Sequence, residues 1–164
     1  MSPALESQLR DRVQPVVVPP SFIKSTSAEE FEKQYDRGNC NWHTLFSSPT
    51  TPTDSLCCGI AYCPPSTANS PPGELRRHRH AQAEIYHVTE GKGVVFIEGN
   101  EYDVEAGSSV FIPGNSEHGM KSRDGEGVRW FYAFPGAAFG DVVYRFSHEE
   151  GERQKTDEVV KAKL

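Results

Sequence analysis

The segment "RRHRHAQAEIYHVTEG", residues 76–91, brings three histidines close to a glutamate. Neutral imidazole nitrogens and a carboxylate oxygen together suit a borderline divalent ion such as iron, zinc, nickel, manganese or copper. His78 and His80 have the same parity, so on a strand both side chains point to one face. Glu84 shares that parity, but a straight strand would hold it about 20 Å from His78. We therefore predict a chain reversal at residues 81–83, which lets these side chains converge.

A fourth ligand is predicted in "GSSVFIPGNSEHG", residues 107–119. His118 follows an expected strand and a Pro113–Gly114 turn, which would return the chain toward the same interior. Four protein ligands leave one or two positions open on a five- or six-coordinate ion, so such a site is suited to a substrate. The other histidines and the nearby arginines are expected outside the site: His43, His87, His148, Arg76, Arg77 and Arg79.

These two segments carry a resemblance to a known family. "GELRRHRHAQAEIYHVTEG" resembles the first motif of the cupin superfamily, in which a glycine precedes His-x-His, three residues, Glu, six residues and Gly. "GSSVFIPGNSEH" is similar to the second motif, with Gly107, Pro113 and His118 at the family spacing. Gly73 lies one residue nearer the first histidine than usual, Gly114 is displaced toward the proline, and Ser122 replaces a frequent asparagine. None of these departures changes a ligand.

The resemblance covers residues 73–122, and expected strands extend it to residues 42–146. It implies an all-β fold: a single cupin barrel, a double-stranded β-helix or jelly roll, often found as a homodimer. It also implies one divalent transition metal ion, Fe²⁺, Zn²⁺, Ni²⁺ or Mn²⁺, held by His78, His80, Glu84 and His118. Residues 1–41 are expected to form an N-terminal arm with a short helix, and residues 147–164 a charged C-terminal tail.

The texture of residues 42–146 agrees with an antiparallel barrel, because short apolar or alternating runs are separated by turn residues. A Gly99–Asn100 hairpin turn is expected. Before the barrel, Ser27 and Glu30 fit a capping box and Phe31 and Tyr35 lie four residues apart, which predicts a short helix ending near Gly38. The predicted strands are Trp42–Phe46, Leu56–Tyr62, Leu75–His80, Glu84–Val88, Gly93–Glu98, Glu101–Val104, Ser109–Ile112, His118–Ser122, Val128–Phe134 and Val142–Phe146.

Composition limits the partners. The chain has 164 residues, enough for one domain, and a formal net charge of −6, which argues against a phosphate-binding nucleic-acid surface. No apolar run reaches the ~20 residues needed to span a membrane, and the N-terminus lacks the apolar core of a signal peptide. We therefore expect a soluble, cytoplasmic protein. The four cysteines are interpreted as small apolar fillers in a reducing compartment.

Tyrosines are the candidate catalytic residues. Tyr86 has the parity of Glu84, and a divalent cation nearby would favour its phenolate, giving a base or a further ligand. A wall residue of the barrel is the alternative interpretation. Tyr144 or Tyr132 could also face the cavity. The motif resembles that of single-domain cupin lyases that cleave dimethylsulfoniopropionate to acrylate and dimethyl sulfide, which implies Tyr86 and Tyr144 as catalytic residues.

The first functional hypothesis is therefore a metal-dependent lyase that removes a proton beside a small substrate carboxylate and expels a leaving group. An Fe²⁺ cupin dioxygenase is the runner-up. An isomerase or decarboxylase of secondary metabolism remains open, and the aromatic residues Phe96, Phe111, Trp130 and Phe131 would suit a hydrophobic substrate. A non-catalytic cupin that binds a small molecule is the remaining alternative.

Overall fold

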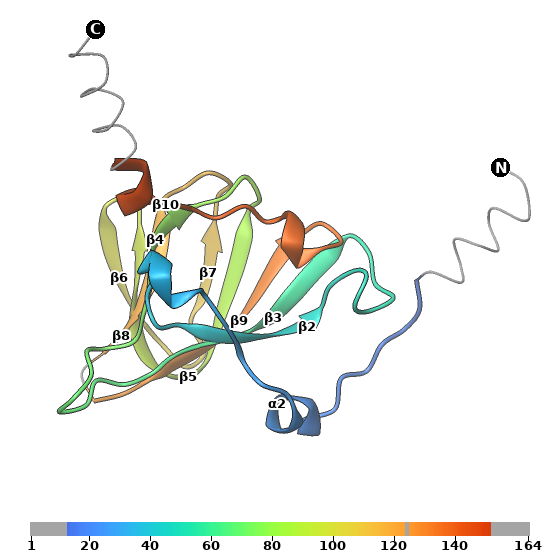
Figure 1. Cartoon of the computed structure of the whole chain (residues 1–164), viewed down its shortest axis with the longest axis horizontal. Helices are drawn as coiled ribbons and strands as arrows, with labels where there is room; N and C mark the ends of the chain where they lie inside the picture. Colours follow the sequence, from blue (N-terminus) through green and yellow to red (C-terminus); the bar gives the residue numbers. More distant parts are fainter. Residues whose placement is uncertain (1–12, 124, 152–164) are drawn as a thin grey trace, which may run out of the picture.

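The structure is a computed structural model that describes residues 13–123 and 125–151, and it is an all-β barrel with only short helices (Figure 1). The short helices are α2 (Ser21–Ser25), η1 (Lys33–Tyr35) and η2 (Phe139–Asp141). The strands are β1 (Glu29–Glu30), β2 (Asn41–Phe46), β3 (Leu56–Cys63), β4 (Glu74–Arg79), β5 (Glu84–Ile97), β6 (Asn100–Glu105), β7 (Ser109–Ile112), β8 (His118–Ser122), β9 (Val128–Pro135) and β10 (Arg145–Phe146).

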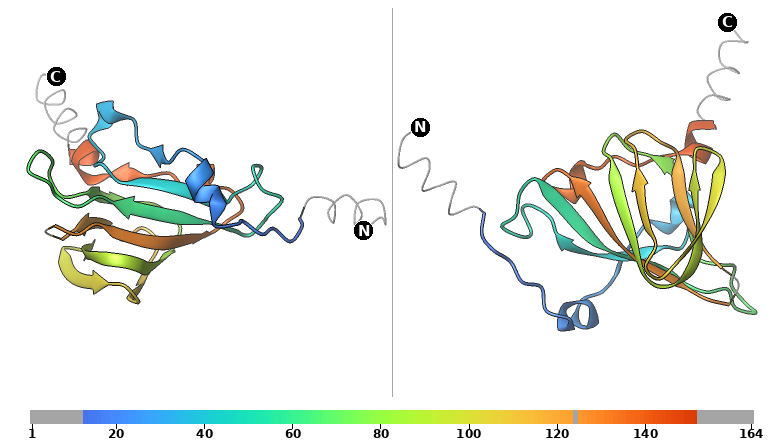
Figure 2. Two further views of the ribbon diagram at one scale, coloured as in Figure 1. Left: turned by 90° about the horizontal axis from the view of Figure 1, so that it is seen from below. Right: turned by 180° about the vertical axis from the view of Figure 1, so that it is seen from behind.

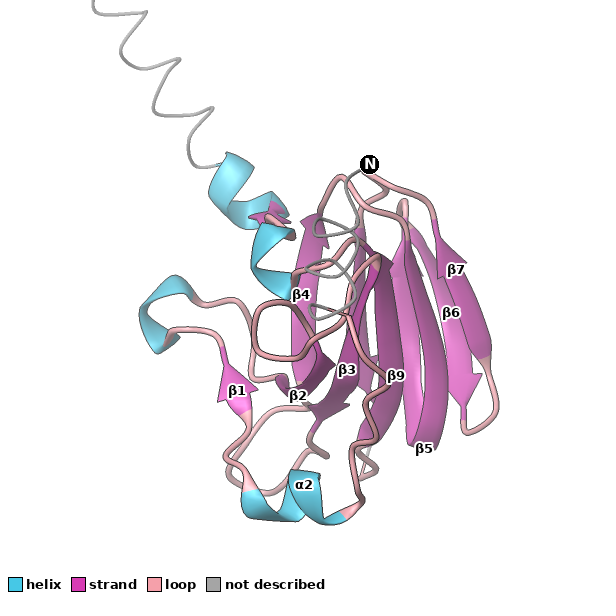
Figure 3. Cartoon of the chain, turned by 90° about the vertical axis from the view of Figure 1, so that its right-hand side faces the viewer, coloured by secondary structure: helices cyan, strands magenta, loops and turns pink. Residues whose placement is uncertain are grey.

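The described strands form one curled antiparallel sheet in the order β1-β2-β3-β9-β5-β8-β4-β10, with β6 and β7 also paired to β5. Figure 3 shows β1, β2, β3, β9 and β5 side by side in this order. The first part of β5 pairs with β7 and β9, and its second part with β6 and β8. This strand therefore joins the two halves of the barrel, which curl toward each other in Figure 2.

The two strands predicted at Glu84–Val88 and Gly93–Glu98 are thus one continuous strand, β5. A bulge between Val88 and Glu90 lies near its middle. Gly91 follows with a φ of 74°. A Cβ at this position would lie 1.8 Å from the Gly127 carbonyl oxygen, so the close approach requires glycine. Gly91 therefore lies inside one continuous strand, whereas the prediction ended one strand before it and began the next strand after it.

The barrel interior is lined by alternate residues of each strand, as a strand period of two requires. On β9 the buried side chains are Trp130, Tyr132 and Phe134, with Val128 before them. The inward residues of β3 are small by contrast: Cys57, Gly59, Ala61 and Cys63. Large side chains on β9 thus lie beside small ones on β3, and the Tyr132 side chain lies over Gly59, where a Cβ would be 2.4 Å from the phenol oxygen.

The helix predicted between Ser27 and Gly38 is wrong. Glu29–Glu30 forms β1 on the edge of β2, and only Lys33–Tyr35 makes a helical turn. The Glu29 carboxylate accepts a hydrogen bond from the Thr44 backbone N–H at 2.8 Å, and the Phe31 ring lies 4.8 Å from the Trp42 ring. These tertiary contacts outweigh the local helical pattern. The short helix of the arm is α2, which the sequence pattern did not predict.

Smaller differences concern the ends of elements. The predicted strand Val142–Phe146 is reduced to β10, Arg145–Phe146, because η2 and an extended stretch precede it. The hairpin turn consists of Glu98 and Gly99, with φ values of 47° and 80°, one residue earlier than predicted. Residues 147–151 are helical, whereas residues 1–12 of the predicted arm and 152–164 of the predicted tail lie outside the described residues. Within the described part of the chain, no helix is long and apolar enough to cross a membrane.

Candidate metal centre

Four donor side chains meet inside the barrel. His78 lies in β4 directly opposite His118, the first residue of β8. His80 follows β4, and Glu84 begins β5 after a reversal at residues 81–83, as the spacing predicts. Each of the four is at most 3% exposed. One donor atom from each lies within 4.8 Å of the others.

The backbone sets the orientation of all three imidazoles. His78 Nδ1 lies 2.8 Å from the Arg76 carbonyl oxygen, and His80 Nδ1 lies 2.9 Å from that of Gln82. His118 Nδ1 lies 2.8 Å from the carbonyl oxygen of Ser116. A carbonyl only accepts, so each Nδ1–H donates and a neutral ring keeps its lone pair on Nε2. This is the tautomer that a metal ligand needs, and carbonyl partners of this kind fix metal-binding histidines in other proteins.

The inward-facing atoms fit a cation. Glu84 Oε2 lies 3.2 Å from His80 Nε2 and 3.1 Å from His118 Nε2. His78 Nε2 is buried and has no hydrogen-bond partner among the described residues. A carboxylate and two lone pairs repel each other unless a positive charge lies between them, and ligands bound at about 2.0–2.2 Å to one ion are about 3 Å apart. The donor set therefore fits a divalent transition metal ion.

A lowered pKa keeps the His78 imidazole neutral, as a metal ligand must be. Complete burial lowers its pKa well below the ordinary histidine value, and the neighbouring His118 lowers it further. The ring is therefore neutral at physiological pH, so no proton competes for its Nε2 lone pair.

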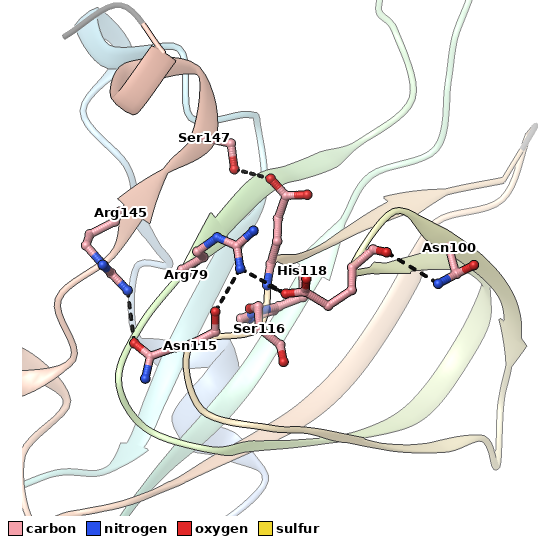
Figure 4. Close-up of polar contacts among 9 residues, drawn as sticks. Arg79, Asn100, Asn115, Ser116, His118, Arg145 and Ser147 are labelled. Carbon is pink, nitrogen blue, oxygen red and sulfur yellow. Dashed lines mark hydrogen bonds and ion pairs between the residues drawn. The ribbon is translucent and has the colours of Figure 1, made fainter. Parts of the chain in front are cut away.

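A polar network outside the barrel holds the loop that precedes His118 (Figure 4). The Glu98 carboxylate accepts hydrogen bonds from the Glu117 backbone N–H and from Arg79 Nη1, the latter at 2.9 Å. Arg79 also donates to the Asn115 carbonyl oxygen at 2.9 Å, and Arg145 donates to the Asn115 side chain at 3.0 Å. Arg79 lies between His78 and His80, so the network connects the segment that carries these two ligands with the loop before His118.

Gly114 explains one departure from the cupin motif. A Cβ on Gly114 would lie 2.3 Å from the Ala81 carbonyl oxygen. The following Asn115 N–H donates to the His80 carbonyl oxygen at 2.7 Å. The glycine beside Pro113 thus allows the loop before His118 to rest directly on the reversal at residues 81–83, which brings two ligand segments together.

The two candidate catalytic tyrosines both reach this centre. The Tyr144 ring stacks on His78 at 4.6 Å, and the Tyr86 ring lies 6.3 Å from His118. Burial raises the pKa of both phenols well above the ordinary tyrosine value, and the Glu84 carboxylate raises both further. Both phenols are therefore neutral beside an uncompensated carboxylate, and only added positive charge favours a phenolate.

A small aromatic cavity opens beside Glu84, with a volume of about 20 Å³. Of the residues that the sequence suggested, Tyr86 was expected near the ion, Tyr144 or Tyr132 was expected to face the cavity, and Trp130 was suggested for a hydrophobic substrate. All four line the cavity, but several other lining residues were missed. Phe31 comes from the N-terminal arm and Phe139 from η2, and no local pattern could have placed them. Trp42 could have been found, since it begins an expected strand. The cavity is lined by Phe31, Cys40, Trp42, Ala61, Leu75, Glu84, Tyr86, Trp130, Tyr132, Phe139 and Tyr144.

Three of the four aromatic residues suggested for a hydrophobic substrate do not line this cavity. Phe111 is 66% exposed on the outside of β7. Phe96 lies under the guanidinium of Arg77, 4.6 Å from its ring centre. Phe131 points away from Trp130 and Tyr132, because successive residues of a strand face opposite sides.

The remaining histidines lie outside the donor cluster. His43 Nε2 is 3.2 Å from the Thr26 carbonyl oxygen, and His87 Nδ1 is 2.9 Å from the Ser109 hydroxyl. His148 Nε2 is 3.3 Å from the Tyr35 carbonyl oxygen. None of the three belongs to the group of side chains close enough to share an ion.

Comparison with known proteins identifies the family. The cupin domain model matches residues 66–134, which include all four donor residues. The chain is also 36% identical over 110 residues to dimethylsulfoniopropionate lyase DddW of Ruegeria pomeroyi, which covers 67% of this chain and 68% of that protein. The chain is a cupin.

Solved structures agree with this family at the level of the fold. The polyketide cyclase RemF of Streptomyces resistomycificus superposes on this cupin with a TM-score of 0.60 at 20% identity, covering 76% of this chain and 81% of that one. A chain from crystal structures of the dimethylsulfoniopropionate lyases RdDddP and RnDddQII superposes with a TM-score of 0.59 at 22% identity, covering 73% and 61%.

Proposed function

We propose that this cupin is a metal-dependent lyase that cleaves dimethylsulfoniopropionate into acrylate and dimethyl sulfide. The observation that carries the proposal is the 36% identity to the lyase DddW across two-thirds of both chains. The buried donor cluster with two phenols beside it supports the same chemistry.

In this proposal His78, His80, Glu84 and His118 hold one divalent ion, Fe²⁺, Zn²⁺, Ni²⁺ or Mn²⁺. Such an ion, when bound, supplies positive charge that acidifies a C–H group beside a substrate carboxylate and favours phenolate over phenol. The three carbonyl acceptors hold the imidazole rings in place throughout. The aromatic wall excludes water, which strengthens each electrostatic interaction inside the cavity.

Tyr86 and Tyr144 are the proposed catalytic residues. One phenolate oxygen takes the proton from the carbon beside the carboxylate. The electron pair of that C–H bond forms the C=C bond of acrylate while the C–S bond breaks, and the electrons of the C–S bond leave with dimethyl sulfide. The second phenol orients the substrate. Aromatic faces around the cavity also suit the sulfonium group, since π systems attract cations that lack hydrogen-bond donors.

The test is turnover with and without oxygen. Purified protein of measured metal content is incubated with dimethylsulfoniopropionate under air and under nitrogen, and dimethyl sulfide and acrylate are quantified. We expect equal amounts of both products and the same rate in both atmospheres, because elimination consumes no oxidant. Turnover that stops under nitrogen would instead favour an Fe²⁺ dioxygenase. No turnover in either atmosphere, with the metal present, would reject the lyase.

We also propose that the protein is a homodimer that pairs through the outer face of β5, β7 and β9. Ile85 and Phe111 lie directly opposite each other on this face and are 49% and 66% exposed. Ala133 continues the apolar surface on β9 beside Ile85. Light scattering after size exclusion should give twice the chain mass, and Phe111→Glu should give the monomer mass. A monomeric wild type would reject this interface.

A cytoplasmic location belongs to the same proposal. All four cysteines are free, and thiols persist in reducing compartments. Fractionation of the native host cells should recover the protein with cytoplasmic enzymes, and recovery with secreted proteins would contradict this location.

A further inference from the structure

Two buried indole groups in the cavity wall have no acceptor. Neither Trp42 Nε1 nor Trp130 Nε1 has a hydrogen-bond partner among the described residues, although both atoms are shielded from solvent. Trp130 is 1% exposed as a whole residue. A buried N–H without an acceptor is costly, and native proteins rarely retain one without a reason. An acceptor supplied by a ligand is such a reason.

Strand register places both indoles around one small residue. Trp42 on β2 pairs with Ala61 on β3, and Ala61 pairs in turn with Trp130 on β9. All three residues line the cavity. Two large side chains therefore flank the Ala61 methyl group on the inner face of the sheet. Because the Ala61 side chain is short, a ligand atom can lie between the two indoles. Tyr86 and Glu84 line the same cavity, and the Tyr86 ring lies 5.5 Å from that of Trp130.

The net charge of the metal centre indicates which hydrogen-bond acceptor the two indole N–H groups bind. Three neutral imidazoles and one carboxylate around a divalent ion leave a net charge of about +1, which a monoanion neutralises. A carboxylate has two oxygens, accepts several hydrogen bonds and donates none, so it matches two indole donors beside a positive centre. A neutral amide lacks this charge, and an onium group cannot accept a hydrogen bond.

We infer that Trp42 and Trp130 bind the carboxylate of the substrate through their indole N–H groups. This inference rests on the proposed function for the identity of the substrate, but the subsite itself can be tested with any small carboxylate. During elimination, negative charge spreads onto the carboxylate oxygens as the proton leaves. The indole donors, already held in position by the sheet, stabilise this charge without reorganisation.

The experiment uses propionate, which has no leaving group, and its neutral analogue propionamide. Both tryptophans of the chain lie in this cavity, so intrinsic tryptophan fluorescence reports on the subsite directly. Propionate is titrated into the Zn²⁺-loaded wild type, Trp42→Phe and Trp130→Phe, and each dissociation constant is measured by calorimetry and by fluorescence. We expect each variant to bind propionate about tenfold more weakly, because phenylalanine keeps an aromatic ring but removes the donor.

Tyr62→Phe is the matched control, since it removes a polar hydrogen from the outer face of β3, the strand that lies between those of Trp42 and Trp130. This variant should bind propionate as the wild type does. Metal content and melting temperature are measured for every variant. Equal propionate affinity in both tryptophan variants, with metal content preserved, would overturn the inference.

If a tryptophan variant does not fold, the wild type alone decides the question. Tryptophan emission that responds to propionate and not to propionamide supports the subsite, and emission that responds to neither overturns it. The two proposals can fail separately. Propionate binding that depends on the indoles without turnover of dimethylsulfoniopropionate removes the lyase and keeps the subsite. Normal turnover in both variants removes the subsite and keeps the lyase.

Discussion

The donor cluster and the aromatic side chains that enclose it are held in place by different means. His78, His80 and His118 are oriented by hydrogen bonds to backbone carbonyls, and the segments that carry them are joined by strand pairing and by polar contacts. The side chains of Phe31 and Phe139, which together form the cover of the cavity, are held by ring contacts: Phe31 lies 4.8 Å from Trp42, and Phe139 lies 5.6 Å from Tyr132. Only the backbone of Phe139 is hydrogen-bonded, since its N–H donates to Ser47 Oγ at 2.9 Å.

The sequence divides in the same way. All four donors lie within residues 66–134, the part that matches the cupin domain model, whereas Phe31 and Phe139 lie outside it. The segment that carries Phe139 is flanked by Gly136 and Gly140, and a Cβ on either would meet nothing within 4 Å. The four donors thus lie in the part of the chain that matches the family model, and the two rings of the cover lie outside that part.

The cover also has to move. The cavity beside Glu84 has a volume of about 20 Å³, which is room for one water molecule. Phe139 separates this cavity from an open groove of about 750 Å³ that it also lines. A substrate with several non-hydrogen atoms cannot occupy the cavity unless Phe139 or Phe31 is displaced. A rigid centre beneath a displaceable cover is the arrangement that the following experiments test.

The largest effect is expected at the rigid centre. Glu84→Gln removes the only negative charge of the donor cluster, so we expect loss of tightly bound metal and a fall in turnover of at least about 100-fold. Elemental analysis and product formation measure the two effects. Glu90→Gln is the matched control, because Glu90 is an exposed carboxylate on the same strand. Full metal occupancy in Glu84→Gln would refute the assignment of the centre.

The next effect concerns the phenols at the boundary between centre and cover. If one of them is the base, then Tyr86→Phe or Tyr144→Phe should retain the metal and lose about 100-fold or more in kcat. Tyr102→Phe, on exposed β6, should leave the rate unchanged. Retention of most activity in both variants would reject a tyrosine base and would agree with a dioxygenase, which needs none.

Truncating Phe139 or Phe31 should change the rate at which metal leaves the centre without changing the affinity for metal. In Phe139→Ala and Phe31→Ala we expect pyridine-2,6-dicarboxylate to remove bound metal roughly tenfold faster, because truncation widens the path to the centre. The affinity for metal should stay the same, since neither ring contributes a ligand. Stopped-flow absorbance of the Co²⁺-loaded protein measures the rate. Phe111→Ala removes a ring outside the barrel and serves as the control. Equal removal rates in all variants would show that the metal leaves by another path.

The donor cluster could be predicted from the sequence, whereas the aromatic cover could not. The reversal at residues 81–83 and the convergence of His78, His80 and Glu84 follow from strand parity and from the ~2 Å length of metal bonds, both of which are local rules. The cover could not be predicted in this way. Phe31 looked like part of an amphipathic helix with Tyr35, but it packs on Trp42 and Tyr144, more than ten and one hundred residues away. Contacts between residues so far apart in the chain produce no periodic pattern in the sequence.

The smallest expected effect is a difference in reactivity between the thiols in the barrel wall and the Cys40 thiol, which lies beneath the cover. Burial raises the pKa of the Cys58 thiol to about 11, so at pH 8 only about one molecule in a thousand carries the thiolate. Ellman's reagent should therefore react with the native protein very slowly and rise to four thiols per chain in guanidinium. Cys40 differs because it lines the cavity beside Phe31. In Phe31→Ala we expect one thiol to become reactive, and Phe31→Ala with Cys40→Ser to lose that reactivity. Reaction of several thiols in Phe31→Ala would mean that removal of the ring loosens the barrel wall as well, and the distinction between a rigid centre and a displaceable cover would fail.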